Sequence, residues 1–111
     1  EFLHVAERWG DAGFDVIVLN ETRCAFVEVK RIGQIENCIF YVSENERMQA
    51  LRMDEHQLWR LWLVDNSGGC HDITDSFIQK IKTNLPSFNK LREQGIRPNE
   101  YMFSLSTKIN T

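Results

Sequence analysis

Two apolar runs rich in β-branched residues lie close together near the start of the chain. They are residues 15–19 (DVIVL) and 24–30 (CAFVEVK), separated by the polar residues 20–23 (NETR). Short β-rich runs joined by a polar loop that begins with Asn are typical of a β-hairpin. Apolar side chains occupy both faces of the two runs, which predicts a strand pair covered on both sides.

The rest of the chain alternates between helix and strand patterns. Ser43 and Glu46 have the spacing of a capping box, which predicts a helix whose buried side includes Met48, Ala50 and Leu51. The other predicted elements are a helix over 1–9, strands over 38–42 and 58–64, a turn over 66–69, a helix from about Thr74 to before Pro86, a short helix over 88–94 and a strand over 101–105. This order predicts an α/β (α+β) fold.

Length and composition indicate one domain over residues 1–111. The chain has 111 residues, 42% hydrophobic and 26% charged, which is ordinary for a soluble globular domain. No apolar run approaches the roughly 20 residues that span a bilayer, so no membrane partner is expected. The sequence starts without Met and inside a predicted helix, so we expect a domain cut from a longer protein, with the other domains of that protein as its partners.

The cysteines favour a reducing compartment. Cys24, Cys38 and Cys70 are an odd number, without a Cys-x-x-Cys spacing, and Cys24 and Cys38 fall in strand-like apolar runs. This pattern argues against a structural zinc site. An intracellular protein, cytoplasmic or nuclear, is expected.

The hairpin has a further consequence for three charged residues. If Leu19 pairs with Cys24, then Asp15 lies directly opposite Glu28, with Cβ atoms roughly 5 Å apart. Lys30 is two residues beyond Glu28 and shares its face of the sheet. Two carboxylates and an ammonium would then meet at one point, an arrangement that can hold a divalent metal. The alternative is an exposed strand end at which Lys30 simply pairs with one of the acids.

The element order and several short motifs resemble a known group of enzymes. Asp on one strand and Glu-x-Lys on the next, in an αβββαβ order, resemble the core of the PD-(D/E)XK, or restriction-endonuclease-like, nuclease superfamily. Residues 13–16 (GFDV), 26–30 (FVEVK), 42–46 (VSENE) with Ala50, and 58–64 (LWRLWLV) are similar to the NO VEIN C-terminal domain family within it. The resemblance covers residues 13 to about 65. It implies a restriction-endonuclease-like αβββαβ core, with a mixed central sheet flanked by helices and an appended C-terminal helix and strand.

The resemblance also implies a chemistry. Asp15 and Glu28 become ligands of Mg²⁺ or Mn²⁺, the Val29 carbonyl a third ligand, and Lys30 the group that positions or activates the attacking water. The implied reaction is metal-dependent hydrolysis of a nucleic-acid phosphodiester, with DNA favoured over RNA, in a nucleic-acid-processing or defence protein. Phe14 stands where the superfamily has Pro, and Arg31 where the family often has Gly.

Four further residues are candidates for substrate binding. Arg31 and Gln34 follow the predicted site, and Gln34 could reach it from the loop. Lys80 and Lys82 begin a basic flank, since residues 80–111 carry six basic and two acidic side chains whereas residues 1–79 carry seven and 14. The simpler interpretation of the two lysines is a helix end, where cations are favoured by the helix dipole.

Other polar and aromatic residues are assigned to structure. The capping role of Glu46 accounts for it without a part in the site. Trp59 and Trp62 could stack on bases, but strand tryptophans beside Leu and Val usually belong to the core.

Two competing functions remain open at this level. The fold could be a catalytically inactive nuclease-like module that binds nucleic acid or another protein, or a plain structural domain with a charged hairpin. Restriction-type enzymes often act as dimers, so a homodimer is a further expectation, although no segment marks an interface.

Overall fold

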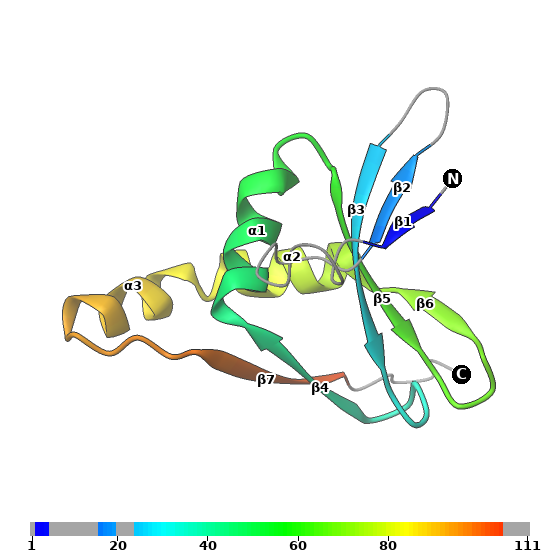
Figure 1. The fold of residues 1–111 in the computed structure, drawn as a ribbon. Coiled ribbons are helices and arrows are strands. Elements are labelled where there is room, and N and C mark those ends of the chain that lie inside the picture. Colours follow the sequence, from blue (N-terminus) through cyan, green and yellow to red (C-terminus); the bar gives the residue numbers. More distant parts are fainter. Residues whose placement is uncertain (1, 5–15, 20–23, 106–111) are drawn as a thin grey trace.

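The computed structural model describes residues 2–4, 16–19 and 24–105, which form two sheets and three helices (Figure 1). The larger sheet contains, in spatial order, β1 (Phe2–His4), β2 (Val16–Leu19), β3 (Cys24–Arg31), β5 (Trp59–Val64) and β6 (Cys70–Asp72). The smaller sheet pairs β4 (Cys38–Ser43) with β7 (Glu100–Leu105). The helices are α1 (Glu44–Asp54), α2 (Thr74–Thr83) and α3 (Leu85–Glu93). The predicted α+β class with a mixed sheet is confirmed.

The hairpin register is the one predicted from sequence. β2 and β3 are antiparallel, with Val16 opposite Val27 and Leu19 opposite Cys24. Asp15 and the loop 20–23 lie outside the described residues. The described pairing of β3 with β2 ends at Val27, and Glu28 is the next residue of β3.

β3 is the central strand of the larger sheet. It is antiparallel to β2 on one side and parallel to β5 on the other, where Glu28 lies opposite Leu61 and Lys30 opposite Leu63. A parallel pair needs a crossover connection, and here β4 and α1 provide it. The crossover is what brings the start of α1 into contact with the side chains of β3.

Two sequence expectations are corrected by the strand pairing. Residues 2–4, expected within a helix over 1–9, form β1, with Leu3 opposite Ile17 of β2. The apolar pattern of so short a segment fits helix and strand equally, and pairing with β2 decides between them. The strand expected over 38–42 is present as β4, but it pairs with β7 and does not join the central sheet.

One face of β5 lies in the hydrophobic core. Trp59, Leu61 and Leu63 are at most 2% exposed and alternate with half-buried residues. They belong to the same buried cluster as residues of α1, α2 and the β4–β7 sheet: Ala50, Phe77, Ile78, Ile81, Phe40 and Phe103. In Figure 1, α1, α2 and the β4–β7 sheet lie to one side of β3 and β5. The core therefore occupies the side of the sheet that also carries Glu28 and Lys30, since paired residues share a face.

The helices follow their predicted start and stop signals with small shifts. Ser43 and Glu46 form the expected capping box at the start of α1. Met48, expected on the buried side, is 42% exposed, whereas Ala50 is fully buried. α3 starts earlier than predicted, at Leu85, because Pro86 sits in its first turn, where a missing N–H costs nothing.

A buried arginine occupies the core-facing side of α1. Arg47 is 0% exposed, and its Nε donates to Glu44 Oε1 at 3.0 Å. Its guanidinium lies over the ring of Phe88 in α3 at 4.6 Å and over that of Tyr101 in β7 at 5.5 Å. Tyr101 in turn donates its hydroxyl to Glu44. Arg47 thus joins α1 to two elements, α3 and β7, that lie far from it in sequence.

No helix among residues 2–4, 16–19 and 24–105 is long and apolar enough to cross a membrane.

Candidate functional site

Glu28 and Lys30 form an ion pair on one face of β3. The Lys30 Nζ lies 3.1 Å from Glu28 Oε1. The Glu28 side chain is 5% exposed and that of Lys30 is 22% exposed. β3 places them together because residues two apart on a strand point to the same face. The predicted proximity of the carboxylate and the ammonium is therefore present in the structure.

Glu46, at the start of α1, is a third member of this group. The Lys30 ammonium donates to both of its oxygens, at 2.9 Å and 3.0 Å. Glu46 Oε1 also accepts the Ser43 N–H at 2.8 Å, so the capping box and the ion pair use the same carboxylate. The sequence interpretation of Glu46 as a capping residue alone is thus incomplete. We refer to Glu28, Lys30 and Glu46 as the charged cluster.

Lys30 and Glu46 favour their ionised forms despite partial burial. Burial alone would lower the pKa of Lys30, but hydrogen bonds and charge from Glu46 and Glu28 outweigh it, and the pKa of the ammonium is raised. Burial would likewise raise the pKa of Glu46, but hydrogen bonds with Glu28, Ser43 and Lys30 outweigh it and lower the pKa. Lys30 and Glu46 are therefore held as a charged pair at neutral pH.

These pKa shifts predict a pH-dependent contribution to stability. The lowered pKa of Glu46 stabilises the fold above the unfolded-state pKa of about 4.3, and that contribution is lost as pH falls toward the folded-state pKa. We expect Glu46→Gln to lower the free energy of unfolding by about 1–2 kcal/mol near pH 7, and by progressively less below about pH 4. Urea unfolding of both proteins between pH 3 and pH 8 measures the difference. A difference that does not change with pH would contradict the ion-pair origin.

The remaining predicted metal ligands are only partly described. Asp15 lies outside the described residues. Val29 lies between Glu28 and Lys30 in β3, opposite Trp62 of β5, and its side chain is half-buried on the other face of the sheet. Within residues 2–4, 16–19 and 24–105, no three or more His, Cys, Asp or Glu side chains are grouped to hold a metal ion. The described residues therefore do not by themselves group three such side chains, and the proposed ligand Asp15 lies outside them.

The weaker candidates after β3 lie away from the charged cluster. Arg31 is an exposed residue at the end of β3, and strand alternation directs it to the face opposite Lys30. Gln34 is exposed in the following loop, where it lines a cleft with Asn66 and Ser67. The structure brings neither side chain into contact with Glu28 or Lys30 through a described hydrogen bond.

The two candidate lysines of the basic flank also lie elsewhere. Lys80 and Lys82 belong to the last turn of α2, as the helix-end interpretation expects. Lys82 pairs with Asp54 at the last residue of α1, whereas Lys30 pairs with Glu46 at its first turn. Eight residues of helix correspond to about 12 Å along its axis. Lys82 is thus separated from the charged cluster by most of the length of α1.

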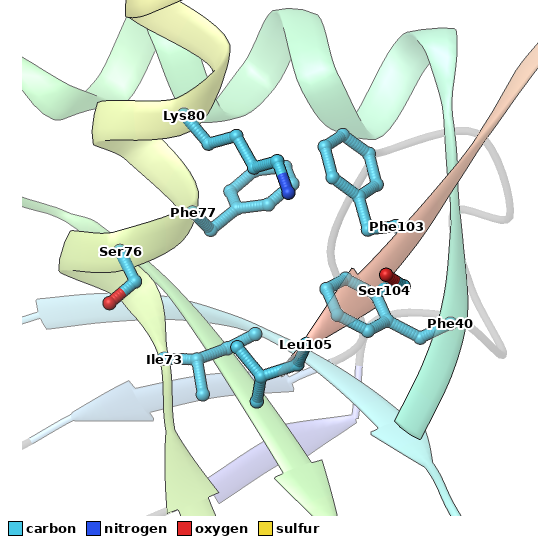
Figure 2. A pocket seen from close by; sticks show the side chains of 8 residues that line it. All are labelled: Phe40, Ile73, Ser76, Phe77, Lys80, Phe103, Ser104 and Leu105. Carbon is cyan, nitrogen blue, oxygen red and sulfur yellow. The ribbon is translucent and has the colours of Figure 1, made fainter. Parts of the chain in front are cut away.

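An apolar pocket lies between α2 and the β4–β7 sheet (Figure 2). The aromatic rings of Phe77, Phe103 and Phe40 form one side, with Phe77 and Phe103 in edge contact at 5.1 Å. Ile73 and Leu105 lie at the other side, and Figure 2 shows the Lys80 side chain crossing in front of the Phe77 ring. The pocket continues the hydrophobic core and includes no residue of the charged cluster.

A second polar cluster stabilises the turn between β5 and β6. Asp65 accepts from the Ser67 and Gly69 N–H groups at 3.0 Å and 2.8 Å, and its other oxygen lies 2.7 Å from His71 Nε2. The hydrogen bond with His71, followed by those with Ser67 and Gly69, holds the pKa of Asp65 far below its usual range. All the contacts are local, and they account for the cluster as a stabilised turn.

Comparison of the chain with protein-family models, with curated proteins and with solved structures found no match in any of the three.

Proposed function

We propose that this chain is a metal-dependent nuclease domain that hydrolyses phosphodiester bonds in nucleic acid, with DNA favoured over RNA. Asp15 and Glu28 are the proposed ligands of Mg²⁺ or Mn²⁺, with the Val29 carbonyl as a third, and Lys30 is the proposed catalytic cation. The observation that carries the proposal is the buried Glu28 carboxylate, 3.1 Å from an ammonium held on the same strand. Burying an unpaired carboxylate costs free energy. A buried pair of opposite charges is therefore typical of a site that binds charged ligands.

The hairpin register and the motif resemblance support the proposal. Val16 opposite Val27 is the register on which the expected pairing of Asp15 with Glu28 depends. Three antiparallel strands, β1 to β3, precede α1 and the parallel β5, an order that fits the βββαβ part of a restriction-endonuclease-like core, with β4 as an addition. In the proposed core, Asp15, Glu28 and Lys30 would take the positions of the superfamily motif.

The donor atoms fit the proposed ions. Carboxylate and carbonyl oxygens are the hard ligands that Mg²⁺ prefers, and it is commonly held by one or two carboxylates, with water and substrate phosphate completing the shell. Such an ion, when bound, would polarise the scissile phosphate and lower the pKa of a bound water. Lys30 supplies a fixed positive charge beside Glu28, where it stabilises the negative charge that develops on the phosphate oxygens.

A cleavage assay tests the proposal directly. The protein is incubated with single- and double-stranded DNA and RNA in Mg²⁺ or Mn²⁺, with EDTA as the metal-free control, and compared with Asp15→Asn. We expect cutting of at least one DNA substrate only with metal, and none by the variant. Failure of the parent protein to cut any substrate, or equal cutting by Asp15→Asn, would overturn the catalytic proposal.

Metal binding can be measured without activity. We expect Mn²⁺ at ten times its Kd to raise the melting temperature by about 5–10 °C, since binding to the folded state alone adds about 1.4 kcal/mol. Glu28→Gln removes the charge of a proposed ligand, so we expect it to abolish this rise. The matched control is Glu36→Gln, an exposed carboxylate in the loop after β3, which should keep the rise. A rise of equal size in both variants would exclude Glu28 as a ligand.

The alternative proposal is an inactive nuclease-like module that binds nucleic acid or protein. It is favoured by the charged cluster itself, because Lys30 is already engaged by two carboxylates. Tight nucleic-acid binding without cutting, unchanged by Mn²⁺ or by Asp15→Asn, would support the module over the enzyme.

A further inference from the structure

Lys30 is held by carboxylates from two separate elements. Glu28 precedes it by two residues in β3 and contacts its ammonium at 3.1 Å. Glu46 reaches it from the first turn of α1, 16 residues away in sequence, with both oxygens within 3.0 Å. The ammonium therefore has a counter-charge that does not belong to the proposed metal ligands.

Glu46 is itself fixed by the start of its helix. Its Oε1 accepts from the Ser43 N–H at 2.8 Å, and its own N–H donates to the Ser43 hydroxyl at 3.1 Å. The Glu46 side chain is 15% exposed, so little water competes for its oxygens. A lysine side chain is long and flexible, and it occupies one position only where its ammonium is held. The Ser43 N–H thus fixes the Glu46 carboxylate at the position where it binds the Lys30 ammonium.

We infer that Glu46 is a positioning residue that keeps the Lys30 ammonium beside Glu28 when Glu28 binds a divalent cation; this inference rests on the proposed function. A cation on Glu28 competes with Lys30 for the same carboxylate and repels the ammonium, since like charges a few ångströms apart repel strongly at a poorly solvated site. The Glu46 carboxylate offsets that repulsion. Without it, Lys30 turns toward solvent, which already reaches 22% of its side chain.

The test uses Glu46→Gln, which separates the two roles of this side chain. Gln at the same helix position also completes a capping box, so the hydrogen bond from Ser43 is kept, whereas the negative charge facing Lys30 is lost. The rate at which acetic anhydride modifies Lys30 is measured by peptide mass spectrometry, with and without Mn²⁺, against the exposed Lys80 as internal reference.

We expect Mn²⁺ to leave the Lys30 modification rate of the parent protein nearly unchanged. In Glu46→Gln we expect Mn²⁺ to raise it by about threefold or more, because the ammonium loses its remaining counter-charge. If Mn²⁺ leaves the Lys30 rate of Glu46→Gln unchanged, the inference is overturned, whether or not the protein cuts nucleic acid. Loss of the Mn²⁺-dependent rise in melting temperature in Glu46→Gln would also overturn it, since Glu46 would then be a ligand.

Cleavage kinetics give a second readout. We expect Glu46→Gln to lower kcat by about 100-fold with little change in the KM for nucleic acid, since a misplaced ammonium affects the transition state more than binding. Ser43→Ala is the matched control, because it removes the capping hydroxyl but keeps the Ser43 N–H that binds Glu46 Oε1, together with Glu46 and Lys30. An equal loss of kcat in Ser43→Ala would make the role of Glu46 structural and overturn the inference. A parent protein that does not cut refutes the nuclease proposal alone, because the modification assay still decides the position of Lys30.

Discussion

Lys30→Met is expected to reduce the rate of phosphodiester cleavage by about 1,000-fold while leaving Mn²⁺ binding intact. The expected size of this reduction follows from the loss of one preorganised charge at a poorly solvated site. Such a loss typically lowers the rate by two to three orders of magnitude. Met retains much of the length and apolar volume of the lysine stem but carries no charge. The two carboxylates of the charged cluster, Glu28 and Glu46, remain in place.

Single-turnover cleavage measures the chemical step of Lys30→Met, and the Mn²⁺-dependent melting temperature measures its metal binding. Lys82→Met is the matched control, since it also removes a lysine paired with a carboxylate, here Asp54 at the end of α1. We expect Lys82→Met to cut at the parental rate. Parental activity in Lys30→Met would refute a catalytic role for Lys30, and a lost Mn²⁺ response would show that its effect is on the metal site.

The hairpin could be predicted from sequence because its constraints are local. Two β-rich runs and a four-residue polar loop leave few registers, and a one-residue slip would exchange the two faces of each strand. The pairs Val16–Val27 and Leu19–Cys24 follow that register. The contact between Glu28 and Lys30 follows from the alternation of side chains along one strand, without knowledge of any other element.

The contact between Lys30 and Glu46 could not be predicted in the same way. It joins residues 16 apart in sequence, and it exists because the crossover from β3 to β5 places the first turn of α1 over β3. The sequence contains a complete local explanation of Glu46 in its capping box. A partly buried lysine on a strand that precedes a crossover helix was the available signal, since such a lysine needs a counter-charge.

The two strand corrections have the same physical origin. Residues 2–4 and 38–43 form hydrogen bonds with β2 and with β7, which are 14 and more than 60 residues away in the pairs Leu3–Ile17 and Ile39–Ser104. Local patterning identifies that β4 is a strand, but the choice of partner depends on which sheet edge remains open after the core has formed. Arg47 is a further example, since its burial depends on the rings of Phe88 and Tyr101.

Trp59→Ala is expected to lower the free energy of unfolding by about 3–5 kcal/mol. Trp59 is 2% exposed at the start of β5, and its ring lies 5.5 Å from that of Phe77 in α2. Truncation removes most of a large buried side chain and leaves a cavity between the sheet and the helix. For a domain of this size the melting temperature should fall by roughly 12–30 °C. Thermal and urea unfolding, followed by circular dichroism, measure both quantities.

Trp62→Ala is the control for this prediction, because it removes the same side chain from the same strand. Trp62 lies on the opposite face of β5, is half-buried, and donates its indole N–H to Asp72 at 3.3 Å. Loss of that partly exposed side chain should cost about 1 kcal/mol. Equal destabilisation by the two substitutions would mean that the Trp62 face is as tightly packed as the core. A small effect of Trp59→Ala with a large loss of nucleic-acid binding would instead assign Trp59 to base stacking, which its burial against Phe77 argues against.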